Sequence, residues 1–352
     1  MSTNEMTPRE RWLTVLNGGV PDRVPMDYRA TKETDARLMQ HLGCGNMSDV
    51  FRRLHVDEIV SLSPKYVGPP IPPDEDIYGI GFQETDYGMG TYRDAVRFPL
   101  AQYKSVAEIE ANYRWPDPDW YDFSVLPAQV EGKEEAVIRG GGSECFDIYR
   151  WMRGNEQGYL DLVDNPEMVH YCLKKIYDFR YEVTRRTYEA VPGKVIWTWV
   201  AEDVACQRGL IVSLECIREF LLPHMKRMID LVHEGGAYSF HHSDGAAREN
   251  VPNMIEIGMD VLDPVQWRCA GMAREELKRE FGDQIVFHGA MDNQQTLAFG
   301  SVEDVRQEVE DNIRILGEGG GYILGPCHNL QVVGPPENIV AMYDAGYEMG
   351  WY

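Results

Sequence analysis

Short apolar runs that end in polar side chains recur through the last two thirds of the chain. VIWTWV precedes Glu202 and Asp203, AYSF precedes His241 and His242, and MDVL precedes Asp263. Segments whose apolar spacing is typical of amphipathic helices lie between these runs. Because alternating strands and helices form a parallel sheet whose strand ends meet at one edge, we expect the polar side chains to gather there.

The same alternation extends over most of the chain. Strands are expected at 23–29, 57–62, 136–141, 194–200, 237–242, 260–266, 284–292 and 321–326. Helices are expected at 8–16, 35–42, 47–54, 149–162, 166–191, 214–234, 246–257, 272–281, 302–316 and 336–346. Thr7 and Glu10 have the spacing of a capping box, and Ser301 is expected to cap a second helix. Eight strand–helix units close a barrel, so the predicted fold is α/β, a single (β/α)8 TIM barrel over residues 1–352. An open, doubly wound sheet is the alternative.

Residues 64–130 break this regularity. They are rich in Pro, Gly, Tyr and Asp and show little periodicity. Long insertions of this kind are usually lids or binding loops. We therefore predict an irregular insertion after the second strand, lying over the barrel mouth and containing a hairpin at 79–97.

Composition narrows the class of protein. The formal net charge of -23 argues against nucleic acid and anionic membranes as partners, because phosphate binding needs clustered Lys and Arg. No apolar run reaches the length of a membrane span, and no signal peptide is evident. The seven cysteines are odd in number and scattered, which favours reduced thiols. The expectation is a cytoplasmic enzyme acting on a small molecule.

His242 and Asp244 are the strongest candidates for chemistry. Two positions apart at a strand end, they point to the same side of the chain. Together with Cys327 or His328 they would supply three zinc ligands and leave a position for substrate. The alternative is a hydrogen-bonded His–Asp cluster that only orients the substrate.

Other polar strand ends have less specific patterns. Of the adjacent acids Glu202 and Asp203, we expect Asp203 to face the cavity as a general acid and Glu202 to cap a helix or pair with a base such as Arg208. A salt bridge at the barrel rim is the alternative role for Asp203. Gln266 and Asp292 are expected to hold a polar ligand, and Trp199 and Tyr149 to line an aromatic pocket wall. His241, Asp263 and His288 are expected to be structural.

Several stretches resemble the uroporphyrinogen decarboxylase superfamily. They are MTPRERWLTVLNGGVPDRVP at 6–25, HHSDG at 241–245, IEIGMDVLDPVQ at 255–266, FGDQIVFHGAMDNQQ at 281–295, GGGYILGPCHN at 319–329 and PPENIVAMYDA at 335–345. The resemblance spans nearly the whole chain and implies a single TIM barrel.

The resemblance implies two chemistries. True decarboxylases of the family need no cofactor and hold porphyrinogen carboxylates with amino-terminal arginines; Arg29 stands at one such place, but DYRATKE lacks the second arginine and LSPKY lacks the family's aspartate. The other branch transfers methyl groups to corrinoids, and its coenzyme M enzymes bind zinc through His-x-Cys and a later Cys. Here Asp244 replaces the cysteine of His-x-Cys, and Cys327 and His328 both remain candidates for the last ligand.

The leading hypothesis is a methyltransferase or demethylase that moves a methyl group from a small methoxylated or N-methylated compound to a corrinoid. Because the chain has no DxHxxG segment, the corrinoid is expected on a separate partner protein. The predicted catalytic residues are Asp203, His242 and His328, with Arg29 and Gln266 orienting the substrate. A homodimer is expected, as in many family members. The alternatives are a carboxy-lyase acting on an aromatic or pyrrolic acid, with Arg29 clamping a carboxylate, and a ligand-binding barrel without chemistry.

Overall fold

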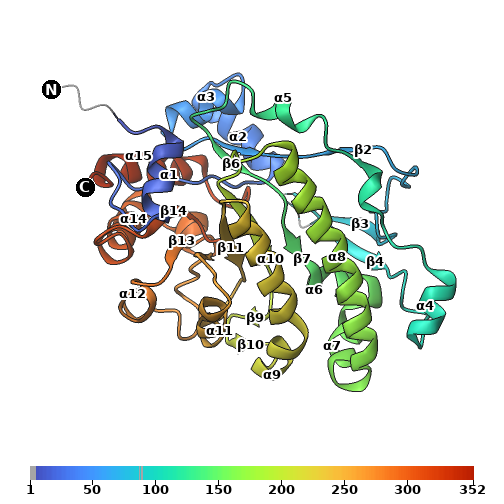
Figure 1. The fold of residues 1–352 in the computed structure, drawn as a ribbon. Helices are drawn as coiled ribbons and strands as arrows, with labels where there is room; N and C mark the ends of the chain where they lie inside the picture. The colour runs from blue at the N-terminus through green and yellow to red at the C-terminus, as the bar shows by residue number, and fades with distance from the viewer. Residues whose placement is uncertain (1–4, 87, 89) are drawn as a thin grey trace.

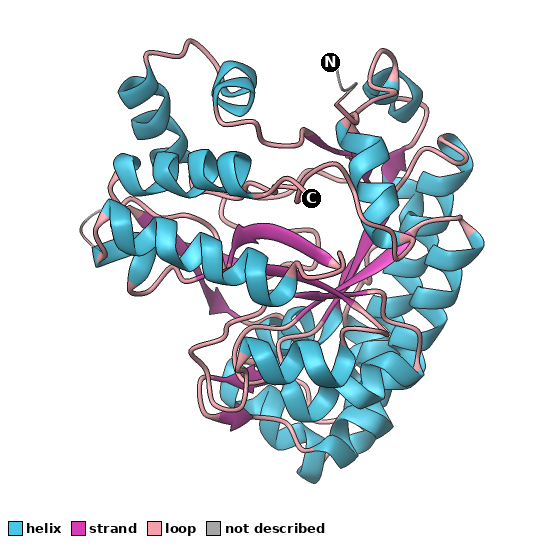
Figure 2. Ribbon diagram, turned by 90° about the vertical axis from the view of Figure 1, so that its left-hand side faces the viewer, coloured by secondary structure: helices cyan, strands magenta, loops and turns pink. Residues whose placement is uncertain are grey.

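Seven parallel strands form the curved sheet at the centre of the computed structural model, which describes residues 5–86, 88 and 90–352. In sheet order they are β1 (Ile59–Ser61), β6 (Val137–Arg139), β8 (Trp197–Ala201), β11 (Tyr238–His242), β12 (Val261–Asp263), β13 (Val286–Met291) and β14 (Tyr322–Pro326). Figures 1 and 2 show helices surrounding this sheet. These strands lie where the apolar runs predict them.

The first predicted strand, 23–29, closes the ring as a single bridge. Met26 pairs in parallel with Leu324 of β14, and its carbonyl accepts a hydrogen bond from the Asp57 amide at 3.0 Å. Pro25 has no N–H and cannot extend the ladder, which accounts for the short pairing. The fold is therefore a (β/α)8 TIM barrel, as predicted.

The helices also follow the expected order. They are α1 (Pro8–Leu16), α2 (Lys32–Leu42), α3 (Met47–Arg53), α6 (Cys145–Arg153), α7 (Asn155–Asp164), α8 (Pro166–Ala190), α9 (Leu214–Cys216), α10 (Leu222–Glu234), α11 (Val251–Glu256), α12 (Arg274–Phe281), α13 (Thr296–Phe299), α14 (Val302–Leu316) and α15 (Pro336–Met349). The capping box at Thr7 and Glu10 and the cap at Ser301 are both present. The predicted helix at 149–162 is two helices, because Gly154 has a φ of 97° and ends α6.

The insertion contains more regular structure than the hairpin expected from its sequence. The hairpin is β3 (Gly81–Asp86) with β4 (Thr91–Arg97), and the other elements are β2 (Lys65–Tyr66), α4 (Val106–Asn112), β5 (Tyr121–Asp122) and α5 (Leu126–Val130). A short β7 (Ser143–Glu144) lies outside the insertion, after β6, and pairs with β8. Most of the insertion lies along α8 (Figure 1). The hairpin reaches the loop after β14, where Gln331 donates to the Tyr92 hydroxyl at 2.5 Å.

Aromatic side chains fill the barrel interior below the strand ends. Trp12 of α1 stacks on Trp197 and Phe240, with ring centroids 6.3 and 5.9 Å apart. Helix α1 therefore closes the amino-terminal end of the barrel, and any cavity must lie at the carboxyl end. Among the described residues, no helix combines the length and the apolar character needed to cross a membrane.

Candidate active site at the carboxyl ends of the strands

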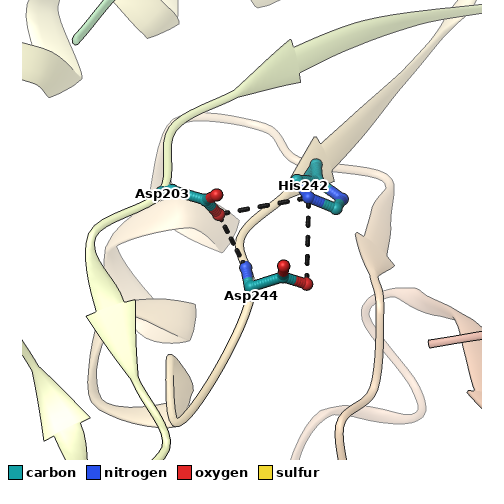
Figure 3. A group of neighbouring side chains, drawn as sticks. All are labelled: Asp203, His242 and Asp244. Carbon is teal, nitrogen blue, oxygen red and sulfur yellow. Dashed lines mark hydrogen bonds and ion pairs between the residues drawn. The ribbon is translucent and has the colours of Figure 1, made fainter. Parts of the chain in front are cut away.

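Asp203, His242 and Asp244 meet at the barrel mouth (Figure 3). His242 is the last residue of β11, and its Nε2 lies 4.0 Å from Asp203 Oδ1 and 3.9 Å from Asp244 Oδ1. The Asp244 amide donates to Asp203 Oδ1 at 2.8 Å, which links the loops after β8 and β11. The structure therefore brings together the three residues that strand-end reasoning selected.

Asp263, the last residue of β12, holds His242 through the ring nitrogen that does not face Asp203 and Asp244. Its carboxylate is 2% exposed and accepts hydrogen bonds from His242 Nδ1 at 2.9 Å and from His288 Nδ1 at 2.5 Å. Arg29 donates to both of its oxygens, at 3.1 and 2.7 Å, and His288 Nε2 contacts Asp27 at 3.0 Å. Asp263 is structural, as expected, but it also fixes the orientation of the central histidine. In the sequence, Pro264 after Asp263 indicates a turn and does not indicate that Asp263 orients a histidine.

The charges in this network support one another. Burial opposes ionisation of Asp263, but Arg29, His288 and His242 hold its pKa well below the usual range. Burial also disfavours a charged His242, yet the hydrogen bond to Asp263 and the charges of Asp263, Asp244 and Asp203 raise its pKa to about 9. His242 is therefore protonated at neutral pH when no cation is bound between its Nε2 and the two carboxylates.

Of the two candidates for a fourth group, only His328 approaches the cluster. Its Nε2 lies 3.9 Å from Asp244 Oδ2, whereas His242 Nε2 approaches the other oxygen of that carboxylate, Oδ1. Cys327 is buried, and its thiol donates to the Val265 carbonyl at 3.2 Å. Burial raises the pKa of the Cys327 thiol well above its usual value. Among the described residues, the donor atoms within 4.8 Å of one another around His242 belong to Asp203, His242 and Asp244, so the structure does not bring the Cys327 sulfur into the group.

Arg29 and Gln266 act on the site through other residues. Arg29 is engaged by Asp263, and Gln266 donates to Asp244 Oδ1 at 2.7 Å while accepting from the Gly245 amide at 2.7 Å. Both side chains position carboxylates in this structure. Trp199 does face the site, with its ring 5.1 Å from the His242 ring and at 85° to it.

Asp292 and Tyr149 differ in their access to the site. Asp292 lines the larger cavity, but Arg268 Nε donates to it at 2.6 Å and three backbone amides of the following turn donate to it at 3.0 to 3.1 Å. Its contact with a ligand stays a prediction. Tyr149 is fully buried, and its hydroxyl donates to Asp161 at 2.6 Å. The prediction that Tyr149 lines a pocket wall is corrected, because it packs α6 within the core.

Glu202 caps a helix, as expected, and Asp203 faces His242, while the general-acid role expected of Asp203 stays a prediction. Glu202 is 1% exposed and accepts the amides of Cys145 and Phe146 at 2.9 and 2.8 Å, which caps α6. His241 is also structural, because its Nδ1 contacts the Val200 carbonyl at 3.0 Å and burial lowers its pKa to about 4.

Sequence reasoning missed two acids beside Asp203. Glu144 and Asp147 come within 4.8 Å of the Asp203 carboxylate. Desolvation in the wall of the site and the nearby charge of Asp147 raise the pKa of Glu144 to about 7. Glu144 follows the apolar run AVIRGGG, a strand-end signal that could have found it, whereas no comparable signal in the sequence precedes Asp147.

Two cavities flank the central cluster. The larger, about 610 Å³, lies over the loops after β11 to β14 and is lined by Asp244, Gln266 and His328 among others. The smaller, about 340 Å³, lies between the insertion, α6 and α8, and Glu144 and Asp147 form part of its wall. Asp203 contacts residues on both sides, so a reactant in either cavity is close to the cluster.

Comparison with known proteins assigns the fold and the family. The sequence model of uroporphyrinogen decarboxylase matches residues 137–349. The uroporphyrinogen decarboxylase of Pseudomonas syringae pv. tomato is 24% identical over 283 residues, 74% of each chain. That of Anaeromyxobacter dehalogenans is 30% identical over 163 residues, 46% of this chain and only 42% of that protein. A methyltransferase from Methanosarcina mazei has the same fold, with a TM-score of 0.69, 17% identity and coverage of 98% of this chain and 99% of the other. The family match covers more than half of the chain and includes β6 to β14 with the cluster at their ends, so the chain belongs to the uroporphyrinogen decarboxylase family.

Proposed function

We propose that this enzyme transfers a methyl group from a small methoxylated or N-methylated compound to a corrinoid carried by a separate protein. The observation that carries the proposal is the group formed by His242 Nε2 and one oxygen each of Asp203 and Asp244, all within 4.8 Å of one another. In the other branch of the family chemistry, decarboxylation, no such group of metal donors is needed.

The donors of this group suit zinc. Imidazole nitrogen and carboxylate oxygen are zinc ligands, and three protein ligands leave a position open, as in catalytic zinc sites. His242 Nδ1 donates to Asp263, the arrangement that typically orients a metal-binding histidine. Gln266 holds Asp244 in a comparable way. His328, whose Nε2 lies 3.9 Å from Asp244 Oδ2, would contact a substrate bound at the open position of the metal.

Zinc bound there would act as a Lewis acid on the oxygen or nitrogen that carries the methyl group. The residues of the chain handle the proton. Glu144 lies within 4.8 Å of Asp203, and its surroundings raise its pKa in the metal-free protein, so it is the group that would donate a proton to the leaving alkoxide or amine. Trp199 and the aromatic filling below it keep water out of the barrel interior.

Metal analysis of the purified enzyme tests the proposal. We expect one zinc per chain, lost in His242→Ala and retained in His233→Ala, which removes an exposed histidine of α10. Formation of methylcobalamin from free cob(I)alamin and a methoxylated substrate should follow the zinc content. Full activity in metal-free protein would contradict the proposal.

Decarboxylation is the second candidate, and one observation favours it. Arg139 faces Trp199, with its guanidinium carbon 4.9 Å from the ring centroid, and forms no salt bridge among residues 5–86, 88 and 90–352. An unpaired arginine beside the cluster can hold a substrate carboxylate. Carbon dioxide release from aromatic acids by zinc-free protein, lost in Arg139→Gln, would establish this reaction in place of methyl transfer.

A further inference from the structure

Two neighbouring polar groups in the wall of the smaller cavity meet no hydrogen-bond partner with good geometry among the described residues. Arg180 of α8 and Tyr78 of the insertion both line it. The Tyr78 hydroxyl and Arg180 Nε are buried without a hydrogen-bond partner, and Tyr78 is 2% exposed. Arg180 takes part in no salt bridge within the described part of the chain.

This arrangement is unusual for a protein with a net charge of -23. A largely buried charge is unfavourable without a partner, and in most proteins an acidic side chain pairs with it. Asp76 and Glu144 line the same cavity and interact electrostatically with Arg180. Within the described part of the chain neither forms a salt bridge with Arg180, and the Asp76 carboxylate accepts the amides of Tyr78 and Ile80 at 2.9 and 3.0 Å. Arg180 Nε therefore remains available to a ligand.

Both side chains can donate to an anion. Arginine remains charged at all relevant pH values and has no acceptor, whereas the Tyr78 hydroxyl can accept as well as donate. Burial raises the pKa of Tyr78 well above its usual value, so its hydroxyl keeps its proton. Two converging donors, one of them charged, are the partners that a carboxylate prefers.

The remaining walls define the rest of the ligand. Ile71, Ile77, Ile148 and Trp151 make much of the cavity apolar. Glu144 lines the same cavity and interacts electrostatically with both Arg180 and His242, so it lies on the route from the guanidinium to the central cluster. A volume of about 340 Å³ accommodates a molecule of the size of one substituted ring.

We infer that Arg180 and Tyr78 form a carboxylate-binding subsite, and that the substrate is a methoxylated or N-methylated carboxylic acid with a compact apolar body. Its carboxylate contacts Arg180 and Tyr78, and its methylated end points past Glu144 towards Asp203. The inference rests on the proposed function for the methyl group, but the subsite itself does not depend on methyl transfer.

Calorimetric binding of two small acids tests the subsite. The probes are 4-methoxybenzoate and N,N-dimethylglycine, with 4-methoxybenzamide as the uncharged control, added to the purified enzyme as isolated. We expect at least one acid to bind, at least tenfold more weakly to Arg180→Gln and several-fold more weakly to Tyr78→Phe. The amide should bind weakly and equally to all variants.

Arg185→Gln is the matched control, because Arg185 lies on the same helix but pairs with Glu182 at the surface. It should bind the acids as the unchanged enzyme does. Tyr78→Phe removes one oxygen only and provides a readout if Arg180→Gln fails to fold. The subsite is overturned if both acids fail to bind at about 10 mM, or if an acid binds with unchanged affinity to Arg180→Gln and Tyr78→Phe.

The two proposals fail in different ways. Arg180-dependent binding of an acid without any methyl transfer would refute the proposed function and leave the subsite intact. Methyl transfer from 4-methoxybenzoate with the same KM in Arg180→Gln would refute the subsite and leave the proposed function intact.

Discussion

Asp57 and Asp263 are buried carboxylates at opposite ends of the barrel, and each is held by more than one cationic side chain. Asp57 precedes β1 at the amino-terminal end and contacts Arg11 at 2.5 Å and Arg23 at 3.1 Å. Asp263 ends β12 at the carboxyl end and contacts Arg29, His242 and His288. Their exposed fractions are 1% and 2%, so burial does not distinguish them.

Asp57 and Asp263 differ in whether a partner of the carboxylate also faces the carboxylates of the candidate site. The remaining partners of Asp57 are the Trp12 indole N–H and the Met26 amide, so every polar group that contacts this carboxylate is a donor held by the fold. One partner of Asp263 is a histidine whose second nitrogen faces two further carboxylates. The same kind of buried charge therefore supports stability at one end and orients a reactive group at the other, as is general for this fold.

The largest effect is expected for Asp57→Ala. Arg11 and Arg23 would lose the buried carboxylate between them and, among the described residues, keep only Asp22 and the half-exposed Glu5 as acidic partners. The free energy of unfolding should therefore fall by about 3–5 kcal/mol. Urea unfolding measures the loss, and zinc binding by the protein that remains folded should be unchanged. Asp74→Ala, at an exposed pair with Arg97, is the control and should change the stability by less than about 1 kcal/mol. Reduced zinc affinity in folded Asp57→Ala would show that the two networks are coupled.

A pH-dependent effect of intermediate size is expected for His242. Its pKa rises from 6.5 to about 9 on folding, so its contribution to the stability of the metal-free protein is complete below pH 6.5 and is lost as the pH rises through 9. The stability difference between the unchanged protein and His242→Gln should therefore shrink across this window, by at most about 3 kcal/mol.

Unfolding curves of the metal-free proteins at pH 6 and pH 9.5 measure this change. The difference in the free energy of unfolding between the unchanged protein and Asp57→Ala should stay constant from pH 6 to pH 9.5, because guanidinium groups do not titrate in this range. A pH-independent difference for His242→Gln would mean that Asp263 does not hold a charged imidazole.

The smallest of the three effects is expected for Asp263→Asn. Loss of the carboxylate behind His242 should weaken zinc binding about 10- to 100-fold, the usual cost of removing such a partner. Competition with a coloured chelator measures the affinity, and Asp57→Asn is the matched control for the loss of one buried negative charge. Equal zinc affinities in Asp263→Asn and Asp57→Asn would mean that Asp263 does not support zinc binding through His242.

The sequence predicted the fold and the centre of the site because both depend on regular periodicity. A strand that ends in His242 places that residue at the mouth of any parallel barrel, and the same holds for Asp203 after β8. Asp292 and Tyr149 had similar sequence signals, but local partners use their polar atoms. Periodicity indicates which face a side chain is on and does not indicate which hydrogen bonds it makes.

Residues with long-range partners were the hardest to assign. Asp263 and Arg29 are 234 positions apart, and their contact appears only when the barrel closes between β14 and β1. Arg180 lies in the middle of a long amphipathic helix, and nothing in its neighbourhood along the chain marks it as unpaired.

From the order of its residues, this chain specifies a closed α/β barrel, an aromatic interior and a set of polar strand ends, because these follow from local spacing of apolar and polar positions. Which of those polar groups are free to bind, which are already paired and which two cavities they border depend on distances between segments far apart in the chain. Hydrogen bonding and burial set those properties, and both arise only when the segments pack together.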